Sequence, residues 1–199
     1  SIPPFRRDDA QKAGCLKTVR RGGASLLCGA MFYNIHEVRR ESMGNPNDMT
    51  TNVRVINWVE AVTKLCQPDK VVWIDGSEAQ LKALRDEAIA TGEMTELNQE
   101  KLPGCLWHIT AQNDVARVED RTFICTKKQE DAGPTNNWMD PDAMREKLKP
   151  LYNGCMKGRT MYVTPYCMGP VGSPFSKVGI ETTDSIYVVL NMDIMNRIG

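Results

Sequence analysis

The spacing of hydrophobic residues changes from irregular to periodic near residue 50. Across residues 52–66 apolar side chains recur every three or four positions, which predicts an amphipathic helix. Pro68 should end it, because proline cannot continue the helical hydrogen bonds. A β-rich run at residues 71–74 predicts a strand, and Ser77 suits the cap of a second helix with Gly92 near its end. The order helix, strand, helix indicates an α/β layer arrangement.

The pattern after residue 100 predicts two strands and a third helix. Residues 105–110 and 121–126 have the composition of strands. The helix should start at Asp140 and run to Leu151 or Tyr152, because a proline stands in its first turn, where the missing N–H costs nothing.

The last forty residues predict a strand, a loop and a fourth helix. A β-branched and aromatic strand at residues 160–165 enters a loop rich in glycine and proline at residues 168–174. Residues 182–184 offer helix caps. The stripe that follows consists of Tyr187, Leu190, Ile194 and Met195 and ends at Gly199. Two adjacent valines within it suit a strand equally well. We expect one α/β domain, a mixed sheet with flanking helices, over residues 49–199.

Residues 1–48 differ from the rest of the chain. They contain pairs of arginines, a flexible Gly-Gly-Ala-Ser run and one short apolar patch at residues 26–33. An arginine-rich, serine-containing leader is typical of mitochondrial targeting, but four acidic residues argue against it, because such peptides are acid-poor. We expect an extension that is disordered or is translated sequence upstream of a start at Met49, and a cytoplasmic protein.

Charge and cysteine usage exclude several classes of protein. Lys+Arg and Asp+Glu both number 25, so nothing favours nucleic acid or an anionic membrane as a partner. No apolar run approaches the ~18 residues that span a bilayer. The 7 cysteines form no CxxC pair, and we expect reduced, mostly buried thiols. Structural zinc is not expected, because His36 and His108 are not at ligand spacing.

The sequence holds none of the common nucleotide or nucleophile motifs. It has no GxGxxG, no GxSxG and no GxxxxGK[ST]. Residues 154–160 look superficially like the last of these, but Lys157 precedes the second glycine, so we interpret them as a turn that leads into a strand. We expect no catalytic, cofactor-binding or metal-binding residue and no self-sufficient catalytic centre in this chain.

The one candidate binding residue is Arg117, within a segment that separates two predicted strands. In a strand-like segment Arg117 and Glu119 project to the same side, because side chains alternate. The planar fork of arginine can grip a carboxylate or phosphate with two hydrogen bonds, and a nearby glutamate could orient it. By itself such a pair is more typical of a surface salt bridge.

Several long sequence blocks change this interpretation of Arg117 and Glu119. Taken in their order along the chain, they resemble the GTP-dependent phosphoenolpyruvate carboxykinases. The resemblance runs from about residue 65 to residue 199. Its blocks are Asp75-Gly-Ser-Glu78, Asp114-Val-Ala-Arg-Val-Glu119, Asp131-Ala-Gly-Pro-Thr-Asn-Asn-Trp138, Gly154-Cys-Met-Lys-Gly-Arg-Thr-Met-Tyr-Val163 and Met168-Gly-Pro170. The third block resembles the bacterial branch of the family.

The resemblance implies an incomplete N-terminal domain of such an enzyme, which turns oxaloacetate and GTP into phosphoenolpyruvate, GDP and CO2 in gluconeogenesis. It implies that Arg117 binds the carboxylate of oxaloacetate or phosphoenolpyruvate and that Glu119 contacts a closing lid. GTP and Mn²⁺ or Mg²⁺ would be bound by residues that this chain does not contain. The family is usually monomeric.

Two residues depart from the family pattern. Asp120 stands where the family usually has serine, and Asp193 where it usually has arginine. A carboxylate beside an anion site weakens anion binding through like charge. Because the residues that bind GTP and metal in the family are not in this chain, we expect a fragment that is inactive alone, with two alternatives. One is a truncated paralogue acting as a small anion-binding or regulatory module, and the other is an α/β domain that shares only ancestry with the enzymes.

Overall fold

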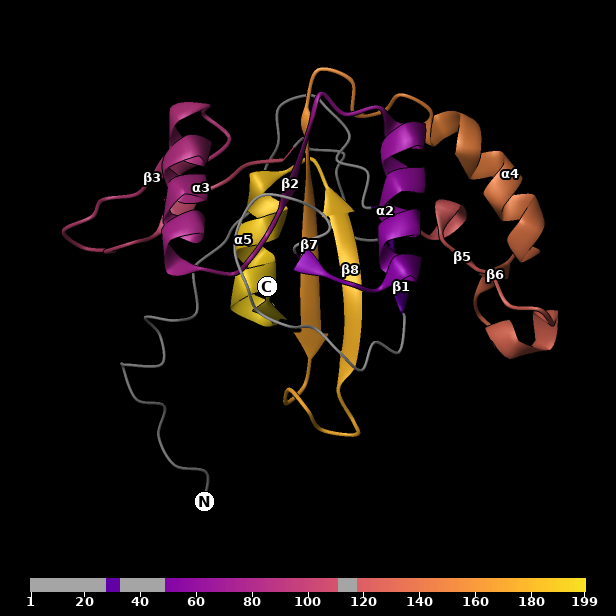
Figure 1. The fold of residues 1–199 in the computed structure, drawn as a ribbon. Coiled ribbons are helices and arrows are strands. Elements are labelled where there is room, and N and C mark those ends of the chain that lie inside the picture. Colours follow the sequence, from indigo (N-terminus) through magenta and orange to yellow (C-terminus); the bar gives the residue numbers. More distant parts are fainter. Residues whose placement is uncertain (1–27, 33–48, 111–117) are drawn as a thin grey trace.

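A mixed five-stranded sheet organises the chain (Figure 1). The computed structural model describes residues 28–32, 49–110 and 118–199. Four strands lie in the order β1 (Cys28–Phe32), β8 (Lys177–Thr183), β7 (Thr160–Met168) and β2 (Lys70–Trp73), and β9 (Arg197–Ile198) also pairs with β7. β2 runs parallel to β7, whereas the other pairs are antiparallel. The predicted mixed α/β architecture is confirmed.

Three of the helices begin at side-chain caps. α2 (Val53–Cys66) follows Asn52, whose side chain accepts a hydrogen bond from the Arg54 N–H. α3 (Glu78–Ala90) follows Ser77, whose hydroxyl accepts from the Gln80 N–H. α4 (Pro141–Tyr152) begins and ends where predicted, and Asp140 is its cap. Each cap satisfies an N–H group that has no partner within its helix.

The two faces of the sheet carry separate hydrophobic cores. α3 and α5 (Ile186–Met195) pack over one face, and α2 over the other (Figure 1). β7 serves both faces, because its side chains alternate: Tyr162 enters the α3–α5 core, whereas Met161 and Val163 enter the α2 core. Burying each large apolar side chain contributes roughly 1.5–3 kcal/mol, so β7 stabilises both layers at once.

The predicted end of β7 at Pro165 is wrong, because the strand continues to Met168. The Ile74 N–H donates to the Val163 carbonyl and the Gly199 N–H to the Pro165 carbonyl. Val163 and Pro165 are two residues apart, so their backbone groups face the same edge of β7. At Pro165 the partner strand on that edge changes from β2 to β9. Its missing N–H therefore removes no ladder bond, which is how this position tolerates proline.

The sequence patterns also missed β8 and misplaced the last turn of the chain. Residues 182–183 are the end of β8 rather than helix caps. Residues 186–195 form a helix, which settles the choice between helix and strand, but it ends at Met195 and is followed by β9. The predicted stripe is only partly buried, since Ile194 and Met195 are 50% and 69% exposed. Strand pairing with β7, distant in sequence, determines both differences.

Two short sheets lie outside the main one. β3 (Thr95–Glu96) pairs with β4 (Leu106–Trp107), and β5 (Phe123–Ile124) pairs in parallel with β6 (Asn137–Trp138). The strands predicted over residues 105–110 and 121–126 are therefore much shorter than expected. Residues 154–160 form the predicted turn into β7.

Other sequence expectations meet the structure only in part. Within the predicted extension, residues 28–32 pair with β8 as β1; the rest of residues 1–48 lies outside the described residues, so the domain boundary stays a prediction. The five cysteines whose side chains the structure describes are free thiols. Only Cys66 and Cys167 among them are buried, so the expectation of mostly buried thiols is wrong for this part of the chain. In the described residues no helix is long and apolar enough to cross a membrane.

A glycine lets β9 pack closely against the turn before α3. Gly76 has φ +68°, and a Cβ there would lie 2.2 Å from the Ile198 carbonyl oxygen. Gly92 has a similar φ of +75° but no atom within 4 Å of a built Cβ. Both glycines need the left-handed backbone conformation, but only Gly76 also lies too close to another segment for a Cβ. Comparing substitutions at the two positions therefore distinguishes the two effects.

We predict that Gly76→Ala destabilises the protein much more than Gly92→Ala. Both substitutions put alanine in the left-handed region, at a cost of roughly 1–2 kcal/mol. Gly76→Ala should cost about 1–3 kcal/mol more, because β9 must move to relieve the overlap. Urea denaturation of both variants measures the difference in unfolding free energy. Equal losses would show that the close approach at Gly76 does not matter.

Candidate functional site

The segment that follows the predicted substrate-binding arginine is a short turn rather than a strand. Arg117 itself lies outside the described residues. Glu119 begins a 3-10 turn, η2 (Glu119–Arg121), which is closed by the Thr122 hydroxyl donating to the Val118 carbonyl at 2.6 Å. The strand-like conformation expected for Glu119 is therefore wrong. This bond competes with an extended conformation, as threonine hydroxyls do near turns.

A second segment holds this turn from the side. The Asn137 amide donates to the carbonyls of Glu119 and Thr122, at 2.6 and 3.3 Å. The Trp138 indole N–H donates to the Thr126 carbonyl at 3.0 Å. The block at residues 131–138 thus supports the backbone directly after Arg117 through side-chain bonds that no local pattern predicts.

The carboxylates of Glu119 and Asp120 remain exposed on this turn. Two neighbouring exposed carboxylates can attract a cationic group, but they cannot hold an anion by themselves. Any anion site here therefore depends on a cation such as Arg117. The second departure from the family pattern, Asp193, lies elsewhere: its carboxylate pairs with Arg85 of α3 at 3.8 Å.

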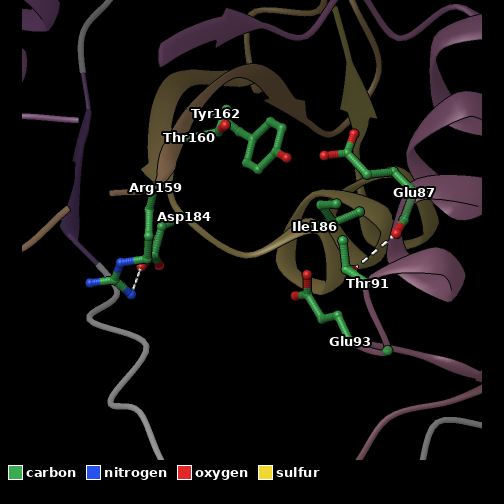
Figure 2. A pocket seen from close by; sticks show the side chains of 9 residues that line it. Glu87, Thr91, Glu93, Arg159, Thr160, Tyr162, Asp184 and Ile186 are labelled. Atoms are coloured by element: carbon green, nitrogen blue, oxygen red, sulfur yellow. Dashed lines mark hydrogen bonds and ion pairs between the residues drawn. The ribbon is translucent and has the colours of Figure 1, made fainter. Parts of the chain in front are cut away.

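An open pocket of about 390 Å³ lies between the end of α3, the start of β7 and the link from β8 to α5 (Figure 2). Its lining comes from three separate parts of the sequence. The residues are Glu87, Thr91, Gly92, Glu93, Arg159, Thr160, Tyr162, Asp184 and Ile186. Sequence reasoning missed this pocket, because only pairing of β7 with β8 and packing of α3 bring these residues together.

One side of the pocket is formed by an ion pair. The Arg159 guanidinium bonds the carboxylate of Asp184 and also donates to the Cys155 carbonyl. Asp184 is only 6% exposed, whereas Arg159 is 45% exposed. Figure 2 shows this pair on the side of the pocket away from Glu87. The Arg159 guanidinium is therefore bonded within the protein and is not free to bind an anion.

Tyr162 presents a neutral hydroxyl on the other side. Burial, with the nearby carboxylates of Glu87 and then Glu93, raises the pKa of Tyr162 to about 12. The residue is 4% exposed, and its hydroxyl points toward Glu87 in Figure 2. The phenol thus stays a hydrogen-bond donor throughout the physiological pH range.

Glu93 caps α5 from a distant part of the chain. Its Oε1 accepts from the Ser185 hydroxyl at 2.6 Å and from the Tyr187 N–H at 3.1 Å. Ser185, at the cap position, makes no side-chain cap bond of its own. A carboxylate at a helix N-terminus satisfies free N–H groups and favours the helix dipole. Glu93 therefore fixes the start of α5 to the end of α3.

His108 supports the same junction. Its Nδ1 lies 2.5 Å from the Glu93 carbonyl oxygen, and its ring stacks on Tyr187 with centroids 4.1 Å apart. These contacts are those of a histidine packed within the fold. In the part of the chain that the structure describes, no group of three or more His, Cys, Asp or Glu side chains could hold a metal ion.

Comparison with known proteins identifies what the chain is similar to. A family model described as the phosphoenolpyruvate carboxykinase N-terminal domain matches residues 57–199. Over 150 residues the chain is 57% identical to the phosphoenolpyruvate carboxykinase (GTP) of Anaeromyxobacter sp. (strain K), a match that covers 75% of this chain and 25% of that protein. It is 51% identical over 153 residues to the same-named protein of Corynebacterium kroppenstedtii, covering 77% and 25% respectively. The chain spans about a quarter of the length of the curated relatives it matches.

We predict that Glu93→Ala lowers the unfolding free energy by about 2 kcal/mol, because it removes two hydrogen bonds to a charged acceptor. The matched control is Glu96→Ala, an exposed glutamate three residues later, which should change stability by less than about 0.5 kcal/mol. Denaturant unfolding compares the two. An equal effect would contradict a capping role for Glu93.

The raised pKa of Tyr162 predicts an alkaline loss of stability. The folded pKa of about 12 exceeds the ordinary tyrosine pKa of 10.0, so the folded state binds the proton more tightly. Stability is fully present below pH 10 and is lost as the pH rises toward 12. Tyr162→Phe should lose less stability over that range. In absorbance titration at alkaline pH, Glu87→Gln should lower the pKa of Tyr162. A wild-type titration in which every tyrosine ionises with a midpoint near pH 10 would contradict the assignment.

Proposed function

The chain belongs to the phosphoenolpyruvate carboxykinase family, as its N-terminal domain, and from this premise we propose that it is the N-terminal part of a GTP-dependent phosphoenolpyruvate carboxykinase. The complete enzyme would convert oxaloacetate and GTP to phosphoenolpyruvate, GDP and CO2 in gluconeogenesis. The observation that carries the proposal is the match of residues 57–199, together with relatives at 48–57% identity that carry this enzyme's name.

In the proposed enzyme this chain contributes part of the organic-acid site. The Arg117 guanidinium binds a carboxylate of oxaloacetate or phosphoenolpyruvate with two parallel hydrogen bonds. Glu119 meets a closing lid, for which its exposed position in η2 is suitable. The amide of Asn137 and the indole of Trp138 hold the backbone after Arg117 in place. Binding the acid in a fixed orientation lowers the entropic part of the barrier.

GTP and a divalent metal belong to other parts of the proposed enzyme. The sequence has no phosphate-binding loop, and the described residues hold no group of metal ligands. The described residues therefore do not fit the binding of GTP or of a divalent metal, and we expect this chain alone to be inactive. We further propose that the protein is cytoplasmic and monomeric, with Mn²⁺ or Mg²⁺ as its metals.

We predict that Arg117→Ala in the complete protein lowers kcat/KM for oxaloacetate about 30-fold or more, since losing a charged pair with the substrate costs about 2–5 kcal/mol. The KM for GTP should stay unchanged, because arginine acts on the acid alone. Arg121→Ala, which removes an exposed arginine four residues later, should change kcat/KM by less than about threefold.

A coupled assay of phosphoenolpyruvate formation measures these constants. A complete protein with no carboxykinase activity would overturn the proposed function. If calorimetry then still detected oxaloacetate binding to wild type and none to Arg117→Ala, the chain would be an anion-binding module instead. Equal losses in the Arg117 and Arg121 variants would remove the specific role of Arg117.

A further inference from the structure

The apolar patch of the N-terminal extension contributes a strand to the main sheet. Residues 28–32 make up β1, whose sequence Cys-Gly-Ala-Met-Phe contains no charged residue and no proline. β1 is the end strand in the order of the sheet and lies antiparallel along the edge of β8 that faces away from β7. The family match begins only at residue 57. A segment from outside the matched domain therefore covers one edge of that domain's sheet.

β8 requires a partner along this outer edge, because most of the strand is buried. Its inner edge pairs with β7 over residues 177–183. Within that range Gly179, Ile180, Thr182 and Thr183 are buried. A buried backbone N–H or carbonyl group without a partner is costly, and an open strand edge is a template for another strand. The outer edge of β8 is therefore suited to receive an extended segment.

The pairing of β1 with β8 is irregular, which is typical of a strand that ends a sheet. The register shifts by one residue between Cys28 and Met31. Between these two positions β1 has residues 29 and 30, whereas β8 has only residue 181 between their partners. Two residues opposite one make a β-bulge. Bulges and short strands keep an edge from pairing further, so β1 closes the sheet on this side.

The composition of the extension selects this segment as the strand. Residues 22–36 form the longest run within residues 1–48 that has no Asp, Glu, Lys, Arg or Pro. Proline and most charged residues are depleted in strands, and proline cannot donate to the ladder. When a strand is added to a sheet edge, main-chain hydrogen bonds provide the affinity. The edge of β8 thus favours an extended, uncharged apolar segment.

We propose that the outer edge of β8 is a strand-addition site, and that residues 28–32 of the same chain are its occupant. The site binds an extended, uncharged apolar segment through backbone hydrogen bonds. This inference goes beyond the proposed reaction and does not depend on it, because it concerns only the pairing of the chain's own backbone.

The test is amide hydrogen exchange in the complete protein, resolved to single residues by mass spectrometry. Met31→Pro/Phe32→Pro removes two consecutive N–H groups of β1, one of which faces β8 because backbone groups alternate. Every second amide of residues 178–183 faces away from β7, and these amides should exchange at least tenfold faster in the variant. The amides that pair with β7 should keep their rates. Lys12→Pro/Ala13→Pro, with two prolines elsewhere in the extension, should change neither set.

A peptide of residues 24–36 tests the site in trans. Added in excess to the Met31→Pro/Phe32→Pro variant under reducing conditions, it should restore slow exchange at the same alternate amides of β8. The same peptide with prolines at positions 31 and 32 should not. Equal β8 exchange in wild type and variant would overturn the proposal. Faster exchange that the intact peptide leaves unchanged would overturn it as well.

A disulfide keeps the proposal testable if the proline variant does not fold. Directly opposite residues of antiparallel strands have Cα atoms about 4.5–5.5 Å apart, which a disulfide can bridge. Thr182→Cys should therefore form a disulfide with Cys28, its Cα partner, under mild oxidation. Thr183→Cys is the matched control, because neighbouring side chains of a strand point to opposite faces. Linked peptides are identified by mass spectrometry, and equal yields from the two variants would count against β1 as the occupant.

Discussion

The hydrogen bonds on both edges of β7 are the constraint on which the rest of the structure depends. Residues 161–167 are buried in an unbroken run, and a buried backbone group without a partner is costly. β8 satisfies one edge, whereas β2 and β9 share the other. The site follows from this pairing. Residues 159–162 and residue 184 meet because β7 and β8 are neighbours, and α3 completes the pocket by packing on the same face.

The junction at Glu93 shows how a distant residue can replace a local signal. Ser185 is a good cap by composition, yet its hydroxyl donates to Glu93 instead of accepting from α5. The carboxylate then accepts the N–H that the serine leaves free. As a result, the start of α5 is tied to the end of α3, and the hydroxyl of Tyr162 lies beside two carboxylates. The geometry of the pocket and the stability of the helix are therefore coupled through one side chain.

The sequence predicts those parts of the fold that are decided within a few residues. Apolar periodicity located α2, the cap at Ser77 located α3, and the proline in the first turn located α4. β8, β9 and the continuation of β7 beyond Pro165 depend on partners far along the chain, which apolar spacing does not report. The same holds for the site. The resemblance singled out Arg117 and Glu119, whereas the bonds from Asn137 to the Glu119 turn and the whole Glu93 junction appear only in three dimensions.

A close contact between two glycines holds the end of β9 against the turn before α3. Gly76 and Gly199 approach each other so closely that a Cβ on either would meet the backbone of the opposing segment, at 2.2 Å from the Ile198 oxygen or 2.1 Å from the Asp75 oxygen. Such an approach holds the end of β9 in one place rather than letting it fray, as chain ends usually do.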